Sequence, residues 1–266
     1  MSAIRPQQSL LVRLLLRVRP HALTSILKPL LGIRRQVIQV ESGARYWIDP
    51  VSNLGRFLSA GNLYEPEVGE LIAKLLQPGN TFVDVGANEG YFSVLAGRIV
   101  GPKGTVISVE PQQRLKAVIE RNRQLNQLEG VLHHVPFGIG AAEGVAQLQL
   151  ASDVNTGASG AKRFWFIGAG EQPMIIKSLE SLAQEFHLEQ IHLLKVDCEG
   201  GEVGVLEGAQ RLLKNHQIHH LLVEYHPHIL GKRECERLHQ LILAAQYTAK
   251  RFGEHTLYSC PSGEPA

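Results

Sequence analysis

The feature that most constrains the fold is a series of short apolar runs separated by helical segments. Four of the runs read TFVDV, TVISVE, LLKVD and LLVEY, and each contains or ends close to an acid. Their apolar residues are continuous rather than alternating, which is typical of strands buried on both faces. We expect strands at 81–87, 105–110, 131–137, 191–197 and 219–225, and helices at 91–100, 112–127, 202–215 and 233–245. This alternation predicts an α/β fold with a doubly wound, mostly parallel sheet and helices on both faces.

Two smaller elements precede this region. Residues 37–50 (VIQVESGARYWIDP) are typical of a hairpin that turns at Ser42-Gly43, and residues 65–76 carry apolar side chains at helical spacing. Residues 144–177 depart from the alternation, because VAQLQL and PMIIK predict two extra strands that flank a polar loop, DVNTGASG. We therefore divide the chain into an N-terminal extension (1–35), a segment with a hairpin and a helix (36–77) and a main domain (78–260).

Charge is distributed unevenly along the 266 residues. Residues 1–40 carry seven basic side chains and no acid, whereas the remainder has a formal charge of −5. A mildly acidic main body disfavours a nucleic-acid groove. The extension is either a short helix that packs on the body or a basic amphipathic helix that contacts anionic lipid.

Cysteine content and hydropathy bear on where the protein resides. The three cysteines are widely spaced, which argues against a disulfide scaffold, and no apolar run is long enough for a transmembrane helix. We expect a cytoplasmic protein with a possible peripheral membrane contact through residues 1–35.

Acids mark the predicted carboxyl ends of the strands, where open parallel sheets bind ligands. The first strand runs into FVDVGANEGYF, in which Gly86 and Gly90 flank Asn88. Glycines permit a tight turn and close approach of a ligand to the backbone, but the spacing is not the dinucleotide pattern G-x-G-x-x-G. We expect the Asp84 carboxylate to repel a pyrophosphate and to attract a ligand with an ammonium and a sulfonium. Glu110, at the end of the second strand, lies where carboxylates accept hydrogen bonds from ribose hydroxyls.

With these residues the sequence resembles the FkbM-type S-adenosylmethionine-dependent methyltransferases. The matching segments are YEPEV (64–68), PGNTFVDVGANEGYFS (78–93), GPKGTVISVEPQ (101–112), LLKVDCEGGEVGVLEGA (193–209) and VEYHP (223–227). The resemblance implies a Rossmann-like class I methyltransferase domain at 78–260 with S-adenosylmethionine as cosubstrate. It implies that the donor is bound by Glu65, Asp84, Gly86, Asn88, Gly90, Glu110, Phe137 and Gly138. It also implies methylation of a hydroxyl on a sugar, a glycolipid or a secondary metabolite.

A hydroxyl nucleophile needs a group that accepts its proton, so we expect catalytic residues beyond the donor site. Asp197, Glu199, Glu224 and His226 follow the fourth and fifth strands, and the imidazole of His226 is suited to proton abstraction near neutrality. Alternatively, Asp197 caps the helix that begins near Gly201, and His226 is an ordinary surface residue.

Other side chains have simpler expected roles. Asp197, Glu199 and Glu224 could together hold a divalent cation, since hard cations favour oxygen ligands, but we assign no metal ligand from sequence. Cys198 is expected to be a small buried hydrophobe and Lys195 a structurally paired residue. Residues 153–159 are expected either to close over the active site or to form a plain exposed loop.

The sequence leaves three functions from different classes open. The favoured one is an S-adenosylmethionine-dependent O-methyltransferase; the alternatives are an NAD-dependent oxidoreductase and a non-catalytic nucleotide-binding module. The absent G-x-G-x-x-G disfavours the oxidoreductase, and the acids at the strand ends disfavour the module. The expected partner is a small-molecule, glycan or lipid acceptor rather than a nucleic acid. The identity of the acceptor and the oligomeric state stay open.

Overall fold

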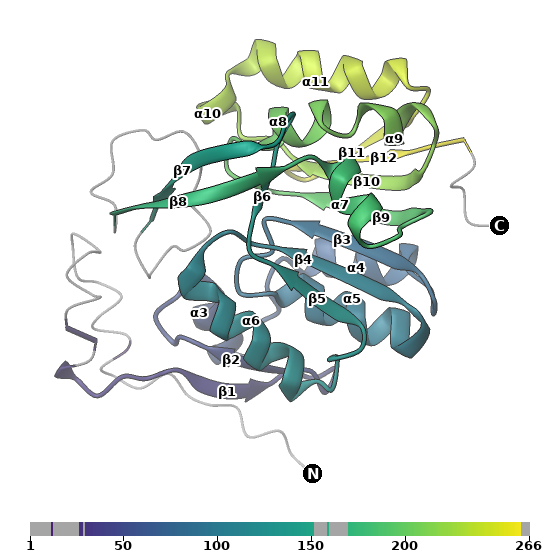
Figure 1. Ribbon diagram of the computed structural model, residues 1–266. Coiled ribbons are helices and arrows are strands. Elements are labelled where there is room, and N and C mark those ends of the chain that lie inside the picture. The colour runs from purple at the N-terminus through teal and green to yellow at the C-terminus, as the bar shows by residue number, and fades with distance from the viewer. Residues whose placement is uncertain (1–11, 13–26, 29, 152–158, 160–169, 262–266) are drawn as a thin grey trace.

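A seven-stranded sheet forms the centre of the protein, as a computed structural model shows for residues 12, 27–28, 30–151, 159 and 170–261 (Figure 1). The strand order is β11-β12-β10-β9-β3-β4-β5. Five neighbouring strands are parallel: β3 (Thr81–Val85), β4 (Thr105–Val109), β5 (Leu132–Val135), β9 (Ile191–Val196) and β10 (Ile218–Glu224). The predicted doubly wound, mostly parallel sheet is thereby confirmed.

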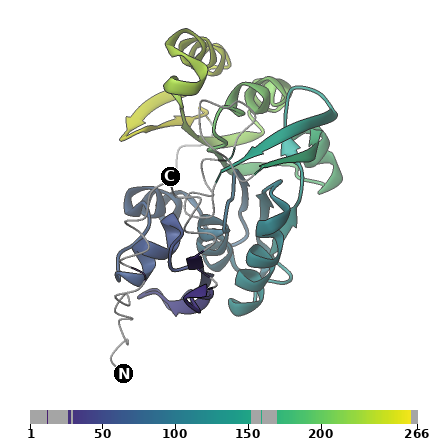
Figure 2. The same ribbon diagram turned by 90° about the vertical axis from the view of Figure 1, so that its left-hand side faces the viewer.

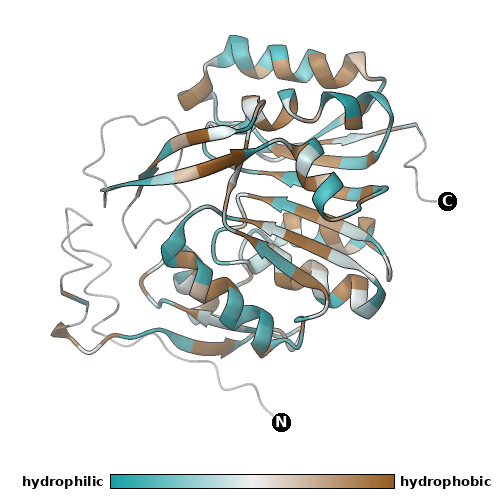
Figure 3. Ribbon diagram, viewed as in Figure 1, coloured by the Kyte–Doolittle hydropathy of each residue, from teal (hydrophilic) through white to brown (hydrophobic). Residues whose placement is uncertain are grey.

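Helices cover both faces of this sheet because its strands are apolar on both sides. Phe82 packs into one core and its neighbour Val83 into the other. The core that contains Phe82 is closed by α4 (Pro66–Leu75), α5 (Tyr91–Val100) and α6 (Gln113–Leu125). The opposite core is closed by α7 (Leu179–Glu185), α8 (Glu202–Glu207), α9 (Gln210–Lys214) and α11 (Lys232–Ala244). In Figure 3 the central strands are largely brown, whereas α6 and α11 carry both colours.

Two predicted elements are interrupted. The predicted strand 131–137 ends at Val135 because Pro136 has no N–H for the ladder, and β6 (Gly138–Ile139) belongs to another sheet. The predicted helix 202–215 is two helices, α8 and α9. Gly208 follows α8 and approaches the Gly140 carbonyl so closely that a Cβ there would lie 2.2 Å from its oxygen.

The two extra strands predicted between 144 and 177 are confirmed. β7 (Gly144–Leu150) and β8 (Gly170–Lys177) are antiparallel, and with β6 they form a three-stranded sheet of order β6-β8-β7. Of the predicted loop at 153–159, only Ser159 lies within the described residues, so its proposed closing role is not addressed.

The C-terminal part contains a hairpin that sequence analysis missed. β11 (Thr248–Phe252) and β12 (His255–Ser259) are antiparallel, and β12 pairs with β10. The sequence of β11, TAKRF, lacks the apolar run of a central strand because β11 is an exposed edge. The structure also has two short helical segments, the 3₁₀ helix η1 (Gly101–Lys103) and the α-helix α10 (Pro227–Leu230).

The predicted N-terminal hairpin is confirmed as β1 (Gln36–Gln39) and β2 (Arg45–Ile48), followed by α3 (Asn53–Ser59). The Gly43 N–H donates to the Val40 carbonyl at the predicted turn. Figures 1 and 2 show β1 at the opposite end of the molecule from α11.

Most of the basic extension, including nearly all of the proposed amphipathic helix, lies outside the described residues. Of the part that is described, Val12 is buried and packs in a small cluster with Val51, Leu27 and Ile33. Lys28 pairs with Asp49 of the body. For these few residues the structure agrees with packing on the body. Within the described ranges no helix is long and apolar enough to span a bilayer.

Candidate active site at the carboxyl edge of the sheet

A cavity of about 560 Å³ lies at the carboxyl ends of β3, β4, β9 and β10. The strand order reverses between β3 and β9, and this switch point is where open α/β sheets bind their ligands. The volume falls within the range of about 300–1,000 Å³ typical of small-molecule sites. The cavity therefore lies where a ligand is expected to bind and is large enough to hold a small molecule.

The glycine loop after β3 forms one wall of the cavity. Gly86 and Asn88 line it, and both have positive φ angles, of 86° and 51°. Glycine is required at position 86 for two reasons: the positive φ angle, and a Cβ that would lie 1.8 Å from the Asp197 carbonyl oxygen. Gly90, by contrast, is not among the described lining residues; it precedes α5 with a φ of 78° and packs near Ile119. Its role is to shape the loop.

Glu110 lies on the second wall, directly after β4. Its carboxylate accepts the backbone N–H groups of Asn88 and Gln112, both at 2.9 Å. Burial raises the pKa of Glu110, and the two backbone donors oppose that shift. These bonds fix the carboxylate against the glycine loop in the position expected for a ribose ligand.

Asp84 requires a correction, because it lies beneath the cavity rather than in its wall. The side chain is 1% exposed and is not among the described lining residues. Its Oδ2 accepts the Ser93 hydroxyl at 2.7 Å, and Lys195 Nζ lies 3.9 Å from Oδ1. Burial raises the pKa of Asp84, with Lys195 opposing. The expected direct attraction of a cationic ligand is therefore replaced by an internal ion pair.

Of the two residues assigned to the adenine end, only Gly138 lines the cavity. Phe137 is buried, and its ring contacts Lys177, whose Nζ lies 4.7 Å from the ring centroid. Phe137 is therefore not among the described lining residues, and its ring is directed toward Lys177 rather than into the cavity.

Glu65 also lines the cavity, within electrostatic range of Lys195, Asp197 and Glu224. It precedes α4 with a φ of 41°, and its Oε2 is buried with no hydrogen-bond partner among the described residues. Burial raises the pKa of this carboxyl, and the charge of Lys195 opposes the shift. A carboxylate oriented in this way is available to a polar ligand.

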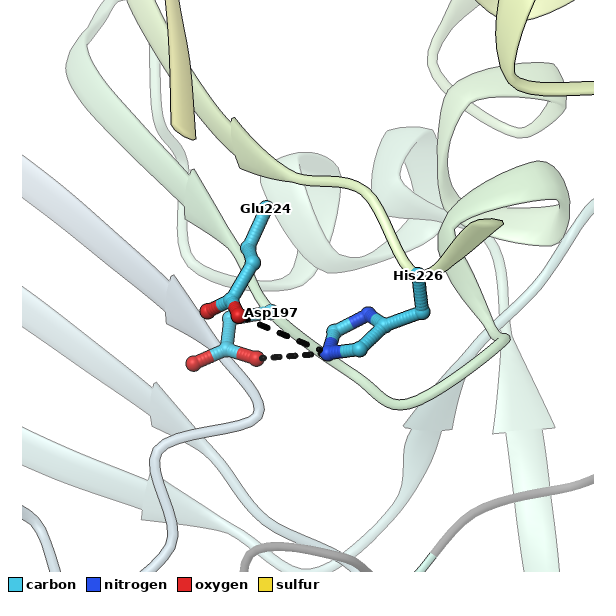
Figure 4. Close-up of side chains that lie close together, drawn as sticks. All are labelled: Asp197, Glu224 and His226. Atoms are coloured by element: carbon cyan, nitrogen blue, oxygen red, sulfur yellow. Dashed lines mark ion pairs between the residues drawn. The ribbon is translucent and has the colours of Figure 1, made fainter. Parts of the chain in front are cut away.

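The four predicted catalytic residues meet at the ends of β9 and β10. Figure 4 shows Asp197, Glu224 and His226 pointing toward one another. His226 Nε2 lies 3.9 Å from Asp197 Oδ1, 3.7 Å from Glu224 Oε1 and 3.7 Å from Glu199 Oε2. All four line the cavity that also contains Gly86 and Glu110.

His226 is 6% exposed, so the alternative of a surface histidine is wrong. Its Nδ1 bonds to Glu202 Oε1 at 2.7 Å, and Glu202 is fully buried at the start of α8. Burial alone would lower the pKa of His226, but the hydrogen bond and charge of Glu202, with the charges of Glu199 and Asp197, raise it to about 9. Burial raises the pKa of Glu199 to about 7.

Asp197 does not cap the following helix. α8 has no side-chain cap, and Asp197 Oδ2 instead accepts Lys195 Nζ at 2.9 Å. Burial would raise the pKa of Asp197, but Lys195 lowers it below its usual value. Burial raises the pKa of the adjacent Cys198 thiol, in agreement with an unreactive hydrophobe.

Two residues of this site were not identified as functional from sequence. Lys195 was expected to be structurally paired, which is confirmed, but it also lines the cavity while 2% exposed. Glu202 carried no signal other than an acid at the start of a helix. A lysine inside the apolar run LLKVD was a usable signal, because a buried lysine requires an anionic partner.

Comparisons with known proteins give one family. The family model for the methyltransferase FkbM domain matches residues 84–249. No curated protein matches the chain.

Solved structures similar to the chain include an S-adenosylmethionine-dependent O-methyltransferase from Thermotoga maritima, at 11% identity and a TM-score of 0.44, covering 85% of this chain and 78% of that one. A methyltransferase from Geobacter sulfurreducens has 16% identity and a TM-score of 0.44, with 74% of this chain and 80% of that one covered. Fibrillarin from Aeropyrum pernix, with natively bound S-adenosylmethionine, has 11% identity and a TM-score of 0.41 over 84% and 81% of the two chains.

Proposed function

The chain belongs to the FkbM methyltransferase family, whose members are S-adenosylmethionine-dependent, and on that premise we propose that it methylates a hydroxyl of a sugar, a glycolipid or a secondary metabolite. The family membership favours this activity over an oxidoreductase or a non-catalytic module. Residues 78–260 form the methyltransferase domain in this proposal, and residues 36–77 complete it by supplying Glu65.

The donor lies along the glycine loop. Glu110 accepts the ribose hydroxyls, Gly138 lies against the adenine, and Gly86 and Asn88 border the methionine portion. Glu65, which lines the same cavity, also contacts the donor in this proposal. Asp84 and Gly90 contribute indirectly, Asp84 by holding Lys195 and Gly90 by shaping the loop.

One observation carries the assignment of a hydroxyl acceptor: Asp197, Glu199, Glu224 and His226 converge within the same cavity as Glu110. A hydroxyl is a weak nucleophile, so nearby proton acceptors assist its attack. The new C–O bond forms as the C–S bond of the sulfonium breaks, and the hydroxyl proton passes to a carboxylate of this cluster. S-adenosylhomocysteine leaves as a neutral thioether. Because the sulfonium is already reactive, in-line positioning supplies much of the rate.

The charge of the cavity bears on the type of acceptor. Its lining includes eight acids and one lysine among the described residues: Glu65, Glu89, Glu110, Asp197, Glu199, Glu207, Glu224, Glu234 and Lys195. Such a wall repels the phosphate backbone of a nucleic acid. This supports an uncharged, hydroxyl-rich acceptor.

The test uses S-adenosylmethionine with a labelled methyl group and fractionated glycan and lipid extracts. We expect label to enter an acceptor at oxygen, identified by mass spectrometry of the product. The Glu224→Gln protein should bind the donor normally and transfer the methyl group more slowly. Transfer to nitrogen or to nucleic acid, or donor binding without any transfer, would contradict the proposal.

A further inference from the structure

His226 presents one ring nitrogen to a centre surrounded by carboxylates. The side chain is more than nine-tenths buried, and Nε2 makes no hydrogen bond within the described part of the chain. The oxygens that face it belong to Asp197, Glu224 and Glu199, at 3.9, 3.7 and 3.7 Å. These separations exceed the length of a hydrogen bond. Nε2 is therefore directed into the cluster without a hydrogen-bond partner among the described residues.

Two of the three side chains have their other polar atom held by a hydrogen bond to an outer partner: Lys195 holds Asp197 Oδ2 at 2.9 Å and Glu202 holds His226 Nδ1 at 2.7 Å. For the third, His255 Nε2 lies 3.3 Å from Glu224 Oε2 without forming a hydrogen bond. The atoms left over, Asp197 Oδ1, Glu224 Oε1 and His226 Nε2, are the ones that face one another (Figure 4). Metal sites have this organisation, in which outer partners orient the ligands and fix the histidine tautomer.

The spacing of these three side chains suits a shared ion. Bonds to Mg²⁺ or Zn²⁺ are about 2.0–2.1 Å long, so two ligands on opposite sides of one ion lie about 4.2 Å apart. The separations of 3.7 and 3.9 Å from Nε2 fall below that limit. One ligand atom from each residue lies within 4.8 Å of the others, so a small side-chain rotation brings all three to bonding distance.

We propose that Asp197, Glu224 and His226 bind a divalent cation that accepts both carboxylate oxygen and imidazole nitrogen, such as Mn²⁺. The mixed donor set favours such an ion over Ca²⁺, which takes oxygen ligands. Three protein ligands leave coordination positions open toward the cavity. This inference rests on the proposed methyl transfer, because the open positions receive the acceptor hydroxyl.

The cation supplies Lewis-acid polarisation, which lowers the pKa of a bound hydroxyl. The proton released from the acceptor passes to a neighbouring carboxylate, for which Glu199, with its Oε2 3.7 Å from His226 Nε2, is placed. Methyl transfer then proceeds as described above, with no change in the oxidation state of the ion. An acceptor with two adjacent hydroxyls gains most, because both oxygens can reach one ion.

The experiment measures Mn²⁺ binding to the full chain after treatment with a chelator, by calorimetry and by pulsed electron paramagnetic resonance. We expect one equivalent of Mn²⁺ with a coupled imidazole nitrogen. Loss of even an outer partner of a metal ligand typically costs about 10–100-fold in affinity. Glu224→Gln and His226→Ala should therefore weaken binding by at least about tenfold, and His226→Ala should remove the nitrogen coupling.

Glu207→Gln is the matched control, because Glu207 lines the same cavity but pairs with Arg237. It should bind Mn²⁺ as the wild type does. Glu224 is partly exposed, so its variant keeps the test valid if His226→Ala fails to fold. Absence of Mn²⁺ binding by the wild type, or equal binding by the wild type and both ligand variants, would overturn the inference.

Donor binding separates this inference from the proposed function. Calorimetry with S-adenosylmethionine in the presence of the chelator should show binding, because no assigned donor ligand is a metal ligand. Donor binding and oxygen methylation without Mn²⁺ would contradict the metal site and support the proposed function. Mn²⁺ binding with no transfer to any hydroxyl would support the metal site and contradict the proposed function.

Discussion

Lys195 lies directly opposite Asp84 on the neighbouring parallel strand, and both side chains are almost completely buried. Lys195 Nζ lies 3.9 Å from Asp84 Oδ1 and 2.9 Å from Asp197 Oδ2. Burial alone would lower the pKa of Lys195, but Asp197 and Asp84 outweigh that effect and raise it. The lysine thereby links a structural carboxylate beneath the cavity to a catalytic candidate in its wall.

Replacing this lysine should destabilise the fold. Lys195→Met leaves Asp84 buried without a cation, and breaking such a pair costs about 3–5 kcal/mol. It also removes the contact of Nζ with the Phe92 ring, 5.3 Å away. Urea unfolding should show the loss, and adding Asp84→Asn should restore part of it. A Lys195→Met protein as stable as the wild type would contradict the role of Lys195.

Glu110 should be required for donor binding. In Glu110→Gln, an amide NH₂ replaces one of two oxygens that each accept a backbone N–H, and the negative charge is lost. Hydrogen bonds to charged groups contribute about 1.5–3 kcal/mol, so the affinity for S-adenosylmethionine should fall about 10–100-fold by calorimetry. Glu129→Gln, at an exposed position, is the control and should bind normally. Equal affinities would exclude the ribose contact.

Gly86 and Gly79 allow a matched comparison of two glycines. Both have a positive φ, 86° and 89°, but a Cβ on Gly86 would lie 1.8 Å from the Asp197 carbonyl, whereas around Gly79 there is nothing within 4 Å. Gly79→Ala should therefore cost only the backbone strain, about 1–2 kcal/mol. Gly86→Ala should cost more and should also abolish donor binding. Equal losses of stability in thermal denaturation would contradict the close approach of the two loops.

Stability should depend on pH through His192. Its Nδ1 accepts the Thr81 N–H at 3.0 Å, and burial, with the neighbouring His219, lowers its pKa below 6.5. The folded state thus binds fewer protons than the unfolded state. The contribution of neutral His192 to the free energy of unfolding is therefore present above pH 6.5, and it is lost as the pH falls through the folded-state pKa of His192.

Urea unfolding at several pH values checks this expectation. Acids also contribute to acid lability, so the informative quantity is the difference between variants. His192→Gln should flatten the pH dependence below neutrality, whereas His187→Asn, at an exposed position, should not. Identical curves for the wild type and His192→Gln would contradict the assignment.

The sheet could be predicted from sequence because its strands are buried on both faces. In TFVDV and LLKVD the continuous apolar run is itself the signal, and the acids or turns at the ends mark the edge that carries the site. β11 gave no such signal, because an exposed edge strand need not be apolar. The break at Pro136 had a local signal, because proline has no N–H for the ladder. The break at Gly208 depends on its close approach to Gly140, which is distant in sequence and which periodicity does not report.

Within the site, position along a strand predicted which residues gather but not which way they point. Asp197, Glu199, Glu224 and His226 meet because the ends of β9 and β10 are neighbours. The direction of Asp84 could not be predicted, because its partner Lys195 lies 111 positions later and appears beside it only through the pairing of β3 with β9. The same holds for Glu202, whose role depends on a contact with His226.

The most direct test of the account is a crystal structure of the protein with S-adenosylhomocysteine. We predict the ribose hydroxyls at the Glu110 carboxylate, the adenine beside Gly138, and the sulfur facing Asp197 and Glu224. Ligand bound elsewhere on the molecule, or bound in this cavity with its sulfur directed away from Asp197, Glu224 and His226, would contradict it.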